Sequence, residues 1–402
     1  MKIAVMGYGT IGSGVVEVLE INKEKIAKRA GEPIEVKYVL DLREFPGTPI
    51  ENKIVHDYKV IAEDPEIGIV VETMGGVEPA FTFVKAMLEA GKQVATSNKN
   101  LVAAKGAELI KVARDHGVNF QFEASVGGGI PIIRPLNKCL TADEIEEITG
   151  ILNGTTNYIL TNMTYGGANF DDALKDAQEK GYAERNPEAD VEGYDACRKI
   201  AILSSLMFSK NVDSEKVPTE GITKITAADF EYANATDHTI KLLGRSRAID
   251  DNTAEVMVAP FLLSKEHPLA MVHGVFNAVF VTGNMLGDSM YYGRGAGKLP
   301  TASAVVSDVV DCARHQGKVI MCFWDKEEVK LADIGEAERS FFIRAKAGAE
   351  DAVTAAFPGG RMVHLKDRKE DFGYFTQSMK EKDFQAKYEA LGGQMLGRIR
   401  LV

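Results

Sequence analysis

The chain has 402 residues, of which 45% are hydrophobic and 26% charged, values typical of a globular protein long enough for two or three domains. Its formal net charge of −11 argues against a nucleic-acid partner or an anionic membrane surface. No apolar run approaches the roughly 18 residues of a membrane-spanning helix. The four cysteines lack metal-site spacing, which predicts reduced thiols in the cytoplasm.

The first residues predict a dinucleotide-binding turn. Lys2–Met6 is an apolar run of strand length, and Gly7-Tyr8-Gly9-Thr10-Ile11-Gly12 leads from it into a helical pattern that extends to Leu19. In such a G-x-G-x-x-G motif the glycines permit the tight turn, the approach of a pyrophosphate and close helix–strand packing. The N–H groups at the start of the helix then face the phosphates. The alternative is a glycine-rich turn that serves packing alone.

Asp41 ends the next predicted strand, Ile34–Leu40, where a carboxylate can accept hydrogen bonds from a ribose 2′-hydroxyl. Its separation from Gly12 is longer than usual, so we expect an extended first helix or loop. Asp41 would repel a 2′-phosphate and therefore favours NAD, whereas Arg43 could bind one and leaves NADP open.

Further strands predict a doubly wound parallel sheet. Ile67–Glu72 is followed by the loop Thr73–Gly76 and an amphipathic helix from Pro79 to Gly91, and a short strand, 93–95, precedes Lys99. Loops at the carboxyl ends of such strands line the ligand crevice. We therefore expect the Thr73 loop and Lys99 to face cofactor or substrate.

A glycine-rich turn, Val126–Ile130, follows a predicted strand at Phe120–Ala124. Successive glycines leave carbonyl groups unshielded, which suits a tight turn, a ligand, or a hard cation held together with Glu123. The residues alone favour the plain turn.

The middle of the chain begins with a predicted strand, Ile145–Leu152, which ends in the turn NGTTNY. Either Thr155 or Thr156 is expected to cap the helix that follows. The turn could present N–H groups to a carboxylate or serve capping alone. A further helix is predicted over 170–180.

An acidic segment within Gly181–Ile200 precedes an apolar helical run. Asp195 and Lys199 lie four apart at the start of this run and would share one helix face, with Asp195 in the first turn. The alternative is a solvated acidic loop with a surface ion pair. The acidic residues of this segment are Glu184, Glu188, Asp190, Glu192 and Asp195.

The last part of the chain alternates strands and helices. Strands are expected over 253–263 and 275–282, and a helix over 301–313 could return the chain to the nucleotide domain. After Trp324 the charged sequence predicts a linker or surface helix. The C-terminal elements are predicted in the order βαββαβ, with strands over 341–345, 361–365, 372–379 and 395–402 and helices over 350–357 and 382–391.

Seven segments together resemble the homoserine dehydrogenase family over residues 1 to about 325. They are GYGTIGSG, TSNKNLVA, FEASVGGGIP, GILNGTTNYIL, GYAERNPEADVEGYDACRK, NAVFVTGN and YYGRGAGKLPTASAVVSD. The resemblance implies reversible NAD(P)H-dependent reduction of L-aspartate 4-semialdehyde to L-homoserine, in threonine and methionine biosynthesis, by a homodimer or higher homo-oligomer.

The resemblance also implies roles for individual residues. Lys199 would exchange the proton at the substrate oxygen, with Asp195 as its partner, and Lys99 would assist near the reacting carbon. Substrate would contact Glu184, Gly154, Thr155, Tyr182 and Asp190. Cofactor would contact Gly7, Gly9, Thr10, Ile11, Gly12, Asp41, Thr73, Lys99, Gly295 and Gly297. A monovalent cation, usually sodium in the family, would lie at Glu123, Val126, Gly128 and Ile130.

Three departures from the family pattern bear on these expectations. Arg294 stands where many relatives carry a small residue or proline, and Leu40 where many carry an arginine, which further favours NAD. The C-terminal βαββαβ segment resembles the ACT regulatory domain, but Ala347-Gly348-Ala349 replaces its usual acidic Pro-Gly loop. It could bind threonine or extend a sheet between subunits.

We therefore predict an α/β protein of three domains. A doubly wound, Rossmann-type dinucleotide-binding domain spans 1–133 and is completed by about 300–325. An α+β catalytic, substrate and dimerisation domain spans 134–299, and a small ferredoxin-like (ACT-like) domain spans 338–402. Two rival functions remain: a phosphorylating semialdehyde dehydrogenase, which needs a cysteine nucleophile and a histidine base, and a catalytically silent amino-acid or nucleotide sensor. Cys139 has no histidine near it and Cys197 lies inside a predicted helix, so neither supports the first function, and the Asp195–Lys199 pair speaks against the second.

Overall fold

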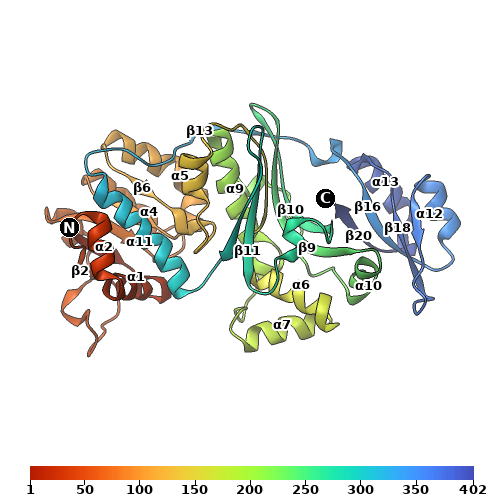
Figure 1. The fold of residues 1–402 in the computed structure, drawn as a ribbon, viewed down its shortest axis with the longest axis horizontal. Helices are drawn as coiled ribbons and strands as arrows, with labels where there is room; N and C mark the ends of the chain where they lie inside the picture. Colours follow the sequence, from red (N-terminus) through yellow and green to blue (C-terminus); the bar gives the residue numbers. More distant parts are fainter. The chain divides into compact units, whose positions relative to one another are not determined.

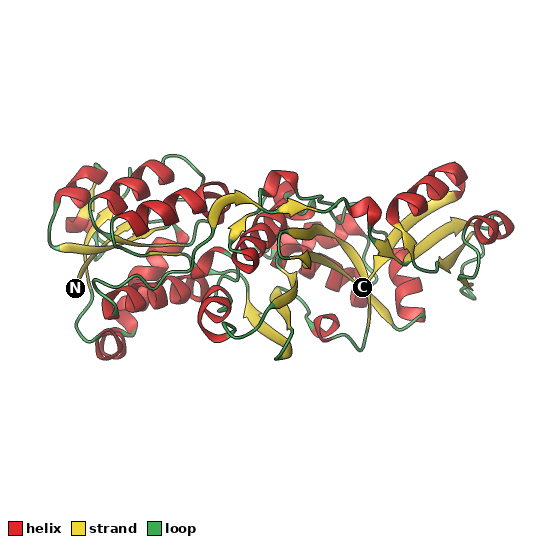
Figure 2. Cartoon of the chain, turned by 90° about the horizontal axis from the view of Figure 1, so that it is seen from above, coloured by secondary structure: helices red, strands yellow, loops and turns green.

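The computed structural model describes residues 1–402, which form two compact units (Figure 1). Unit 1 consists of Met1–Ile148, Arg198–Lys216 and Val281–Val329, and unit 2 of Thr149–Cys197, Val217–Phe280 and Lys330–Val402. Each unit combines helices with strands (Figure 2). No helix combines the length and the apolar character needed to cross a membrane.

Unit 1 is built on a six-stranded parallel sheet. Its strand order, β3-β2-β1-β4-β5-β6, is that of a doubly wound dinucleotide-binding sheet, with the change of direction between β1 and β4. This confirms the predicted parallel α/β domain. The strands are β1 (Lys2–Met6), β2 (Glu35–Leu40), β3 (Ile54–Val55), β4 (Ile67–Glu72), β5 (Gln93–Thr96) and β6 (Phe120–Gln121).

Helices join these strands. A second helix between α1 and β2 accounts for the long separation of Gly12 from Asp41, and it ends at Gly31 in the left-handed region, with φ of 89°. The helices of unit 1 are α1 (Thr10–Ile21), α2 (Lys23–Ala30), α3 (Tyr58–Glu63), α4 (Ala80–Glu89), α5 (Lys99–Asp115) and α11 (Lys298–Arg314).

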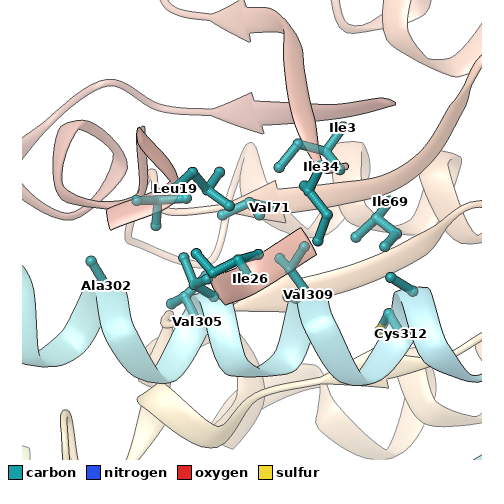
Figure 3. Close-up of a cluster of buried hydrophobic side chains, with 14 of the residues drawn as sticks. Ile3, Leu19, Ile26, Ile34, Ile69, Val71, Ala302, Val305, Val309 and Cys312 are labelled. Carbon is teal, nitrogen blue, oxygen red and sulfur yellow. The ribbon is translucent and has the colours of Figure 1, made fainter. Parts of the chain in front are cut away.

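Helix α11 returns the chain to the nucleotide domain, as predicted. Its buried residues Ala302, Val305 and Val309 pack in one cluster with Leu19 of α1 and Val71 of β4 (Figure 3). Gly14 permits the close approach, because a Cβ at this position would lie 2.9 Å from the carbonyl oxygen of Lys298. The apolar stripe of α11 therefore completes the core of a domain whose other elements lie near the N-terminus.

One prediction about local structure in unit 1 was wrong, and one of two predicted alternatives is excluded. The strand predicted over Phe120–Ala124 stops at Gln121, because the chain turns at Glu123, whose backbone N–H donates to Asp308 of α11 at 2.9 Å. The segment after Trp324 is extended rather than helical: β13 (Asp325–Glu328) pairs in parallel with β8 (Lys210–Asn211). In both cases a distant partner overrides the local pattern. Unit 1 also contains β12 (Gly287–Arg294).

Unit 2 contains the long antiparallel pair β9 (His238–Asp250) and β10 (Thr253–Ser264). In this unit the strand order is β11-β7-β9-β10-β20-β16-β18-β17, and β14 (Lys330–Leu331) pairs with β10. β7 (Ile145–Ile151) and β11 (Phe276–Gly283) enter this unit with residues 149–151 and 276–280. The helices are α6 (Gly154–Gly166), α7 (Phe170–Glu179), α8 (Glu188–Val191), α9 (Tyr194–Phe208) and α10 (Ala227–Ala235), of which α9 continues into the residues of unit 1.

The C-terminal segment has the predicted βαββαβ succession. Its strands run antiparallel in the order β20-β16-β18-β17, and β20 also pairs in parallel with β10. The predicted strand over 372–379 ends at Phe375, because the chain leaves the sheet and β19 (Met379–Lys380) pairs instead with β15 (Glu338–Arg339). The elements are β16 (Phe341–Lys346), α12 (Glu350–Ala356), β17 (Arg361–Val363), β18 (Asp371–Phe375), α13 (Glu381–Leu391) and β20 (Met395–Leu401).

Buried ion pairs attach this segment to the rest of unit 2. Arg344 of β16 donates to Asp229 of α10 at 2.9 Å and to Asp371 at 3.0 Å, and all three side chains are less than a tenth exposed. Arg339 pairs with Glu255 of β10 at 2.5 Å. The C-terminal strands therefore continue the main sheet of unit 2 and share its polar interior.

Candidate active site

The turn between β1 and α1 has the geometry of a dinucleotide-binding motif. Gly7 has φ of 94°, and a Cβ at Gly12 would lie 1.9 Å from the Gly7 carbonyl oxygen, so both positions require glycine. Gly9 is the N-cap of α1, no side chain caps this helix start, and a Cβ at Gly9 would meet no atom within 4 Å. The N–H groups of Thr10 and Ile11 open α1, and a pyrophosphate fits against them.

Asp41 lies at the carboxyl end of β2, beside this turn. Its carboxylate accepts hydrogen bonds from the backbone N–H of Tyr8 at 2.8 Å and from the guanidinium of Arg43 at 2.9 and 3.0 Å. Arg43 holds the pKa of Asp41 well below its usual range, against the opposing effect of burial. The two residues that favour different cofactors are thus paired with each other.

The carboxyl ends of β4 and β5 meet in a hydrogen-bonded cluster. The Thr73 hydroxyl donates to the Gly7 carbonyl at 2.9 Å, which connects the loop after β4 to the glycine turn. Glu72 is fully buried at the end of β4, and Asn98 caps α5, which begins at Lys99. Sequence reasoning assigned no role to Glu72 or Asn98. The sequence contained a signal for each residue. Glu72 is a single charged residue at the end of an apolar strand, and Asn98 is an asparagine directly before a helix, where it can act as the N-cap.

The two glycine-rich segments of the sequence lie against each other in unit 1. The backbone N–H of Gly129 donates to the carbonyl of Arg294 at 3.1 Å. A Cβ at Gly128 would lie 2.2 Å from the Gly295 carbonyl oxygen, and Gly297 has φ of 116° at the start of α11. Because these positions are glycine, the two segments can approach each other until their backbones are in contact.

The side chain of Glu123 is engaged with protein N–H groups. One oxygen accepts from the backbone of Ile132 at 2.6 Å and Ile133 at 2.9 Å, and the other from Arg134 at 2.8 Å. The Arg134 guanidinium lies 3.9 Å away and also pairs with Asp308. A carboxylate saturated by donors and faced by a guanidinium does not fit the role of a cation ligand.

Asn153 gathers several candidate residues of unit 2. It caps α6 by accepting from the Thr156 N–H at 2.8 Å, and its amide donates to Asp190 at 2.7 Å and to Asp195 at 2.9 Å. The predicted threonine cap was wrong, because Asn153 already occupies the extended position before the helix, with φ of −130°. Through one side chain, the start of α6 is joined to the acidic segment.

Thr155 and Tyr182 also belong to this group. The Thr155 hydroxyl donates to the Tyr182 carbonyl at 2.6 Å, and the rings of Tyr158 and Tyr182 lie 4.8 Å apart. Glu184 follows in the loop with an exposed side chain. Gly154 lies close to another backbone segment, since a Cβ there would lie 3.0 Å from the Val275 carbonyl oxygen.

Helix α9 carries Asp195 in its first turn and Lys199 one turn later. This confirms that the run after the acidic segment is helical. Asp195 is 4% and Lys199 8% exposed, which excludes the solvated surface pair that the sequence also permitted. A buried lysine one turn from a buried carboxylate is a suitable proton donor or acceptor.

A second buried lysine lies beneath α6 and was missed. Lys241 of β9 is 2% exposed and donates to the Asn157 side chain at 3.1 Å and to the Val272 carbonyl. The Asn157 amide donates to the carbonyls of Gly274 at 2.9 Å and Phe276 at 3.0 Å. Burial lowers the pKa of Lys241 to about 8. In the sequence, Lys241 is only an isolated charged residue within an apolar strand, and this gives no indication of its partners.

The cysteines do not form a nucleophilic site. Cys197, Cys312 and Cys322 are buried and Cys139 is exposed, and all four are free thiols. Burial raises the pKa of Cys312 and Cys322, so these thiols are poor nucleophiles. This argues against the phosphorylating semialdehyde dehydrogenase chemistry.

Comparison with known families matches most of the chain. A family model described as homoserine dehydrogenase matches residues 131–310, and one described as the NAD binding domain of homoserine dehydrogenase matches residues 7–123. A homoserine dehydrogenase of Synechocystis sp. is 47% identical over 318 residues, which cover 77% of this chain and 73% of the relative. One from Bacillus subtilis is 43% identical over 314 residues, covering 77% and 72%.

Solved structures agree with these relatives. The crystal structure of a homoserine dehydrogenase from Thiobacillus denitrificans has a TM-score of 0.91 and 36% identity, covering 100% of this chain and 98% of that one. A hyperthermophilic archaeal homoserine dehydrogenase in complex with NADPH has a TM-score of 0.67 and 26% identity, covering 78% and 98%.

Proposed function

The chain belongs to the homoserine dehydrogenase family, and from this premise we propose how its residues act on substrate and cofactor. The enzymes of this family are oxidoreductases that interconvert L-homoserine and L-aspartate 4-semialdehyde. The bound nicotinamide cofactor supplies the hydride in one direction and accepts it in the other. We place this reaction in the biosynthesis of threonine and methionine.

The substrate is a zwitterion, so it needs N–H donors for its carboxylate and an anion for its ammonium. We assign the carboxylate to the turn at Gly154 and Thr155, because the first N–H groups of a helix have no partner within the helix. We assign the ammonium to Glu184, an exposed acid in the neighbouring loop. We assign Tyr182 and Asp190 to the same substrate site.

Proton transfer is assigned to Lys199. Reduction of the aldehyde builds negative charge on the oxygen, which a nearby ammonium stabilises and then protonates, and the reverse reaction needs the same group as a base. Asp195, one turn earlier in α9 and also buried, is assigned as the partner of this amine, and Lys99 assists. The single observation that carries the proposal is that Asn153 donates to both Asp190 and Asp195, which joins the substrate turn to the start of α9.

Replacement of Lys199 tests this assignment. Lys199→Met should lower kcat for homoserine oxidation by about two to four orders of magnitude, with an unchanged circular dichroism spectrum. Lys210→Met is the matched control, because Lys210 lies just beyond the same helix and pairs with Glu327 at 2.6 Å; it should keep wild-type kcat. Activity in Lys199→Met close to that of the control would refute the acid–base role.

We propose NAD as the preferred cofactor. Asp41 is supported as a ribose ligand by its place at the end of β2 and by the hydrogen bond from Tyr8. The Arg43 guanidinium donates two hydrogen bonds to Asp41 and is therefore engaged with this carboxylate rather than available to a 2′-phosphate. The ratio of kcat/KM for NAD over NADP should exceed one in the wild type and fall in Asp41→Asn. A wild-type ratio below one would contradict this assignment.

We further propose that a monovalent cation, as in the family, is held by the main-chain carbonyls of Glu123, Val126, Gly128 and Ile130. The support is that the Glu123 carboxylate is occupied by three backbone N–H groups, which leaves only carbonyl oxygens of the turn as ligands. Glu123→Gln should therefore keep the dependence of activity on sodium chloride. A loss of that dependence would assign the cation to the carboxylate.

The C-terminal segment is proposed to be an ACT-like domain. The antiparallel strand order β20-β16-β18-β17 is that of a ferredoxin-like βαββαβ unit. Its edge strand β20 pairs with β10 of the same chain, which favours a structural role over threonine binding. Titration with L-threonine should leave the rate of homoserine oxidation unchanged, and strong inhibition would restore the regulatory role.

We propose a cytoplasmic homodimer. The free state of all four cysteines fits a reducing compartment. Met285 is 79% and Leu286 57% exposed, and neighbouring exposed apolar side chains are typical of a contact surface. Light scattering should give twice the chain mass, and Met285→Ser with Leu286→Ser should lower it. A monomeric wild type would contradict the proposal.

A further inference from the structure

Glu72 is a fully buried carboxyl group without an ionic partner. It closes β4, where it pairs with Met6 of β1 on one side and Thr96 of β5 on the other. No lysine, arginine or histidine forms a salt bridge with it, and burial raises its pKa. An isolated buried carboxyl group lowers the stability of the fold unless its oxygens are hydrogen-bonded. The presence of a glutamate at this position therefore needs an explanation in its surroundings.

Hydrogen bonds from two separate loops converge on this group. One oxygen accepts from the backbone N–H of Met74 at 2.7 Å and of Gly75 at 3.4 Å, in the loop after β4. The other accepts from the Thr96 hydroxyl at 2.5 Å, at the end of β5. The Asn98 amide completes the set at 3.4 Å. Backbone and side-chain donors thus satisfy both oxygens.

Asn98 extends the connection to the start of α5. Its amide also donates to the Gly76 carbonyl at 2.7 Å, and its oxygen accepts from the Leu101 N–H at 3.1 Å as the cap of α5. Its own N–H donates to the Thr96 hydroxyl oxygen at 2.9 Å. The loop Thr73–Gly76 and the first turn of α5, which begins at Lys99, are therefore fixed to one another through Glu72.

The position of this cluster in the sheet relates it to one half of the cofactor. A dinucleotide lies across the crevice where the strand order changes direction, here between β1 and β4. Asp41 at the end of β2 marks the side of the adenosine ribose. Glu72, Thr73 and Lys99 lie at the ends of β4 and the start of α5, on the opposite side, which receives the nicotinamide half.

We propose that Glu72 is a positioning residue for the nicotinamide half of the cofactor: its carboxyl oxygens fix the Thr73–Gly76 loop and the N-terminus of α5 in one arrangement. It touches neither cofactor nor substrate and acts through the groups it holds. This inference rests on the proposed NAD(P)-dependent function. It predicts that loss of the acceptor oxygens impairs cofactor use, whereas loss of the charge alone does not.

Two substitutions at this position separate acceptor from charge. Glu72→Ala should weaken NADH binding by about tenfold, the effect of losing one or two hydrogen bonds at the site, and should raise KM for NAD without raising KM for homoserine. Glu72→Gln keeps the oxygen that accepts from Met74 and should stay within about threefold of wild type. NADH fluorescence titration and initial rates measure both.

The matched control is Glu255→Gln, another buried carboxyl, which pairs with Arg339 in unit 2. It should lower thermal stability while leaving NADH affinity unchanged. If Glu72→Ala fails to fold, Thr96→Val serves in its place, because it removes the shortest donor to Glu72 and should raise KM for NAD selectively, by about threefold or more.

The outcomes are distinct. Unchanged NADH affinity in folded Glu72→Ala or Thr96→Val, or equal rises in KM for NAD and homoserine, would overturn the positioning role. A Glu72→Gln variant as impaired as Glu72→Ala would also overturn it, because the charge would then be the active feature. A wild type that fails to oxidise homoserine would instead contradict the proposed function.

Discussion

Replacing Lys241 by methionine should change the stability of the protein in a way that depends on pH. Lys241 is buried beneath α6 and has no carboxylate partner: its bonds go to the Asn157 side chain and the Val272 carbonyl. Burial lowers its pKa from 10.5 to about 8, and methionine has nearly the same length without the charge.

The magnitude follows from this shift. In the unfolded chain the amine binds its proton more tightly than in the folded protein, so folding carries a cost that is fully present below pH 8. A difference between 10.5 and about 8 corresponds to about 3 kcal/mol at pH 7. The cost disappears as the pH rises towards the unfolded-state value, and about 1 kcal/mol of it remains at pH 10.

Lys241→Met removes this cost but leaves the Asn157 oxygen without its donor, a loss of about 1 to 3 kcal/mol at any pH. The informative quantity is therefore the change with pH. Relative to wild type, Lys241→Met should gain about 2 to 3 kcal/mol in free energy of unfolding at pH 7 compared with pH 10.

Urea denaturation followed by circular dichroism at the two pH values measures this difference. Lys265→Met, at an exposed position of the same unit, is the control and should show no such pH dependence. A Lys241→Met variant whose stability relative to wild type is the same at both pH values would refute the depressed pKa and the burial argument behind it.

Three further predictions concern binding and stability. Gly9→Ala should keep the wild-type melting temperature and lose more than about tenfold in NADH affinity, since a Cβ there meets no protein atom but enters the pyrophosphate site; wild-type affinity would exclude the phosphate turn. Gly12→Ala should lower both quantities, because its Cβ would lie 1.9 Å from a carbonyl oxygen; an unchanged melting temperature would contradict that packing. Arg344→Met should destabilise the protein by about 3 to 5 kcal/mol in urea denaturation, because it leaves Asp229 buried without its ionic partner, whereas Asp371 keeps Arg368 at 2.8 Å. A cost below about 1 kcal/mol would refute the ion-pair account.

The parallel sheet could be predicted because its signals are local. The strands β1, β2, β4 and β5 are short, mostly apolar runs followed by a glycine or polar turn, and the first turn carries a motif with one structural meaning. Even the long interval before Asp41 was informative, since it predicted an extended first helix or loop, and the structure places a separate helix, α2, in that interval. The helix of Asp195 and Lys199 was predictable for the same reason.

Features that depend on distant partners could not be predicted. Strand β6 ends early because Glu123 donates to Asp308, far along the chain, and the segment from Asp325 is extended because Lys210–Asn211 offers it a pairing edge. Nothing in the sequence near either segment contains this information. The cap of α6 was misassigned for a different reason: Asn153, Thr155 and Thr156 are all good caps, and only the backbone angles decide among them.

The same division holds within the candidate site. The glycine motif identified Gly9, and the end of the predicted second strand identified Asp41. Glu72 and Lys241 were missed, because a single charge in an apolar strand has no interpretation until its donors or acceptors are known from the fold.

The most direct test of the proposed homoserine dehydrogenase activity follows the hydrogen that is transferred from the substrate to the cofactor. The enzyme is incubated with NAD and L-homoserine that carries deuterium at the hydroxyl-bearing carbon, and the reduced cofactor is analysed by mass spectrometry. Our account predicts reduced cofactor with one deuterium per molecule from the wild type, and its near absence from Lys199→Ala. Wild-type protein that binds NADH but forms no deuterated cofactor with either NAD or NADP would contradict the assignment of this chain's activity.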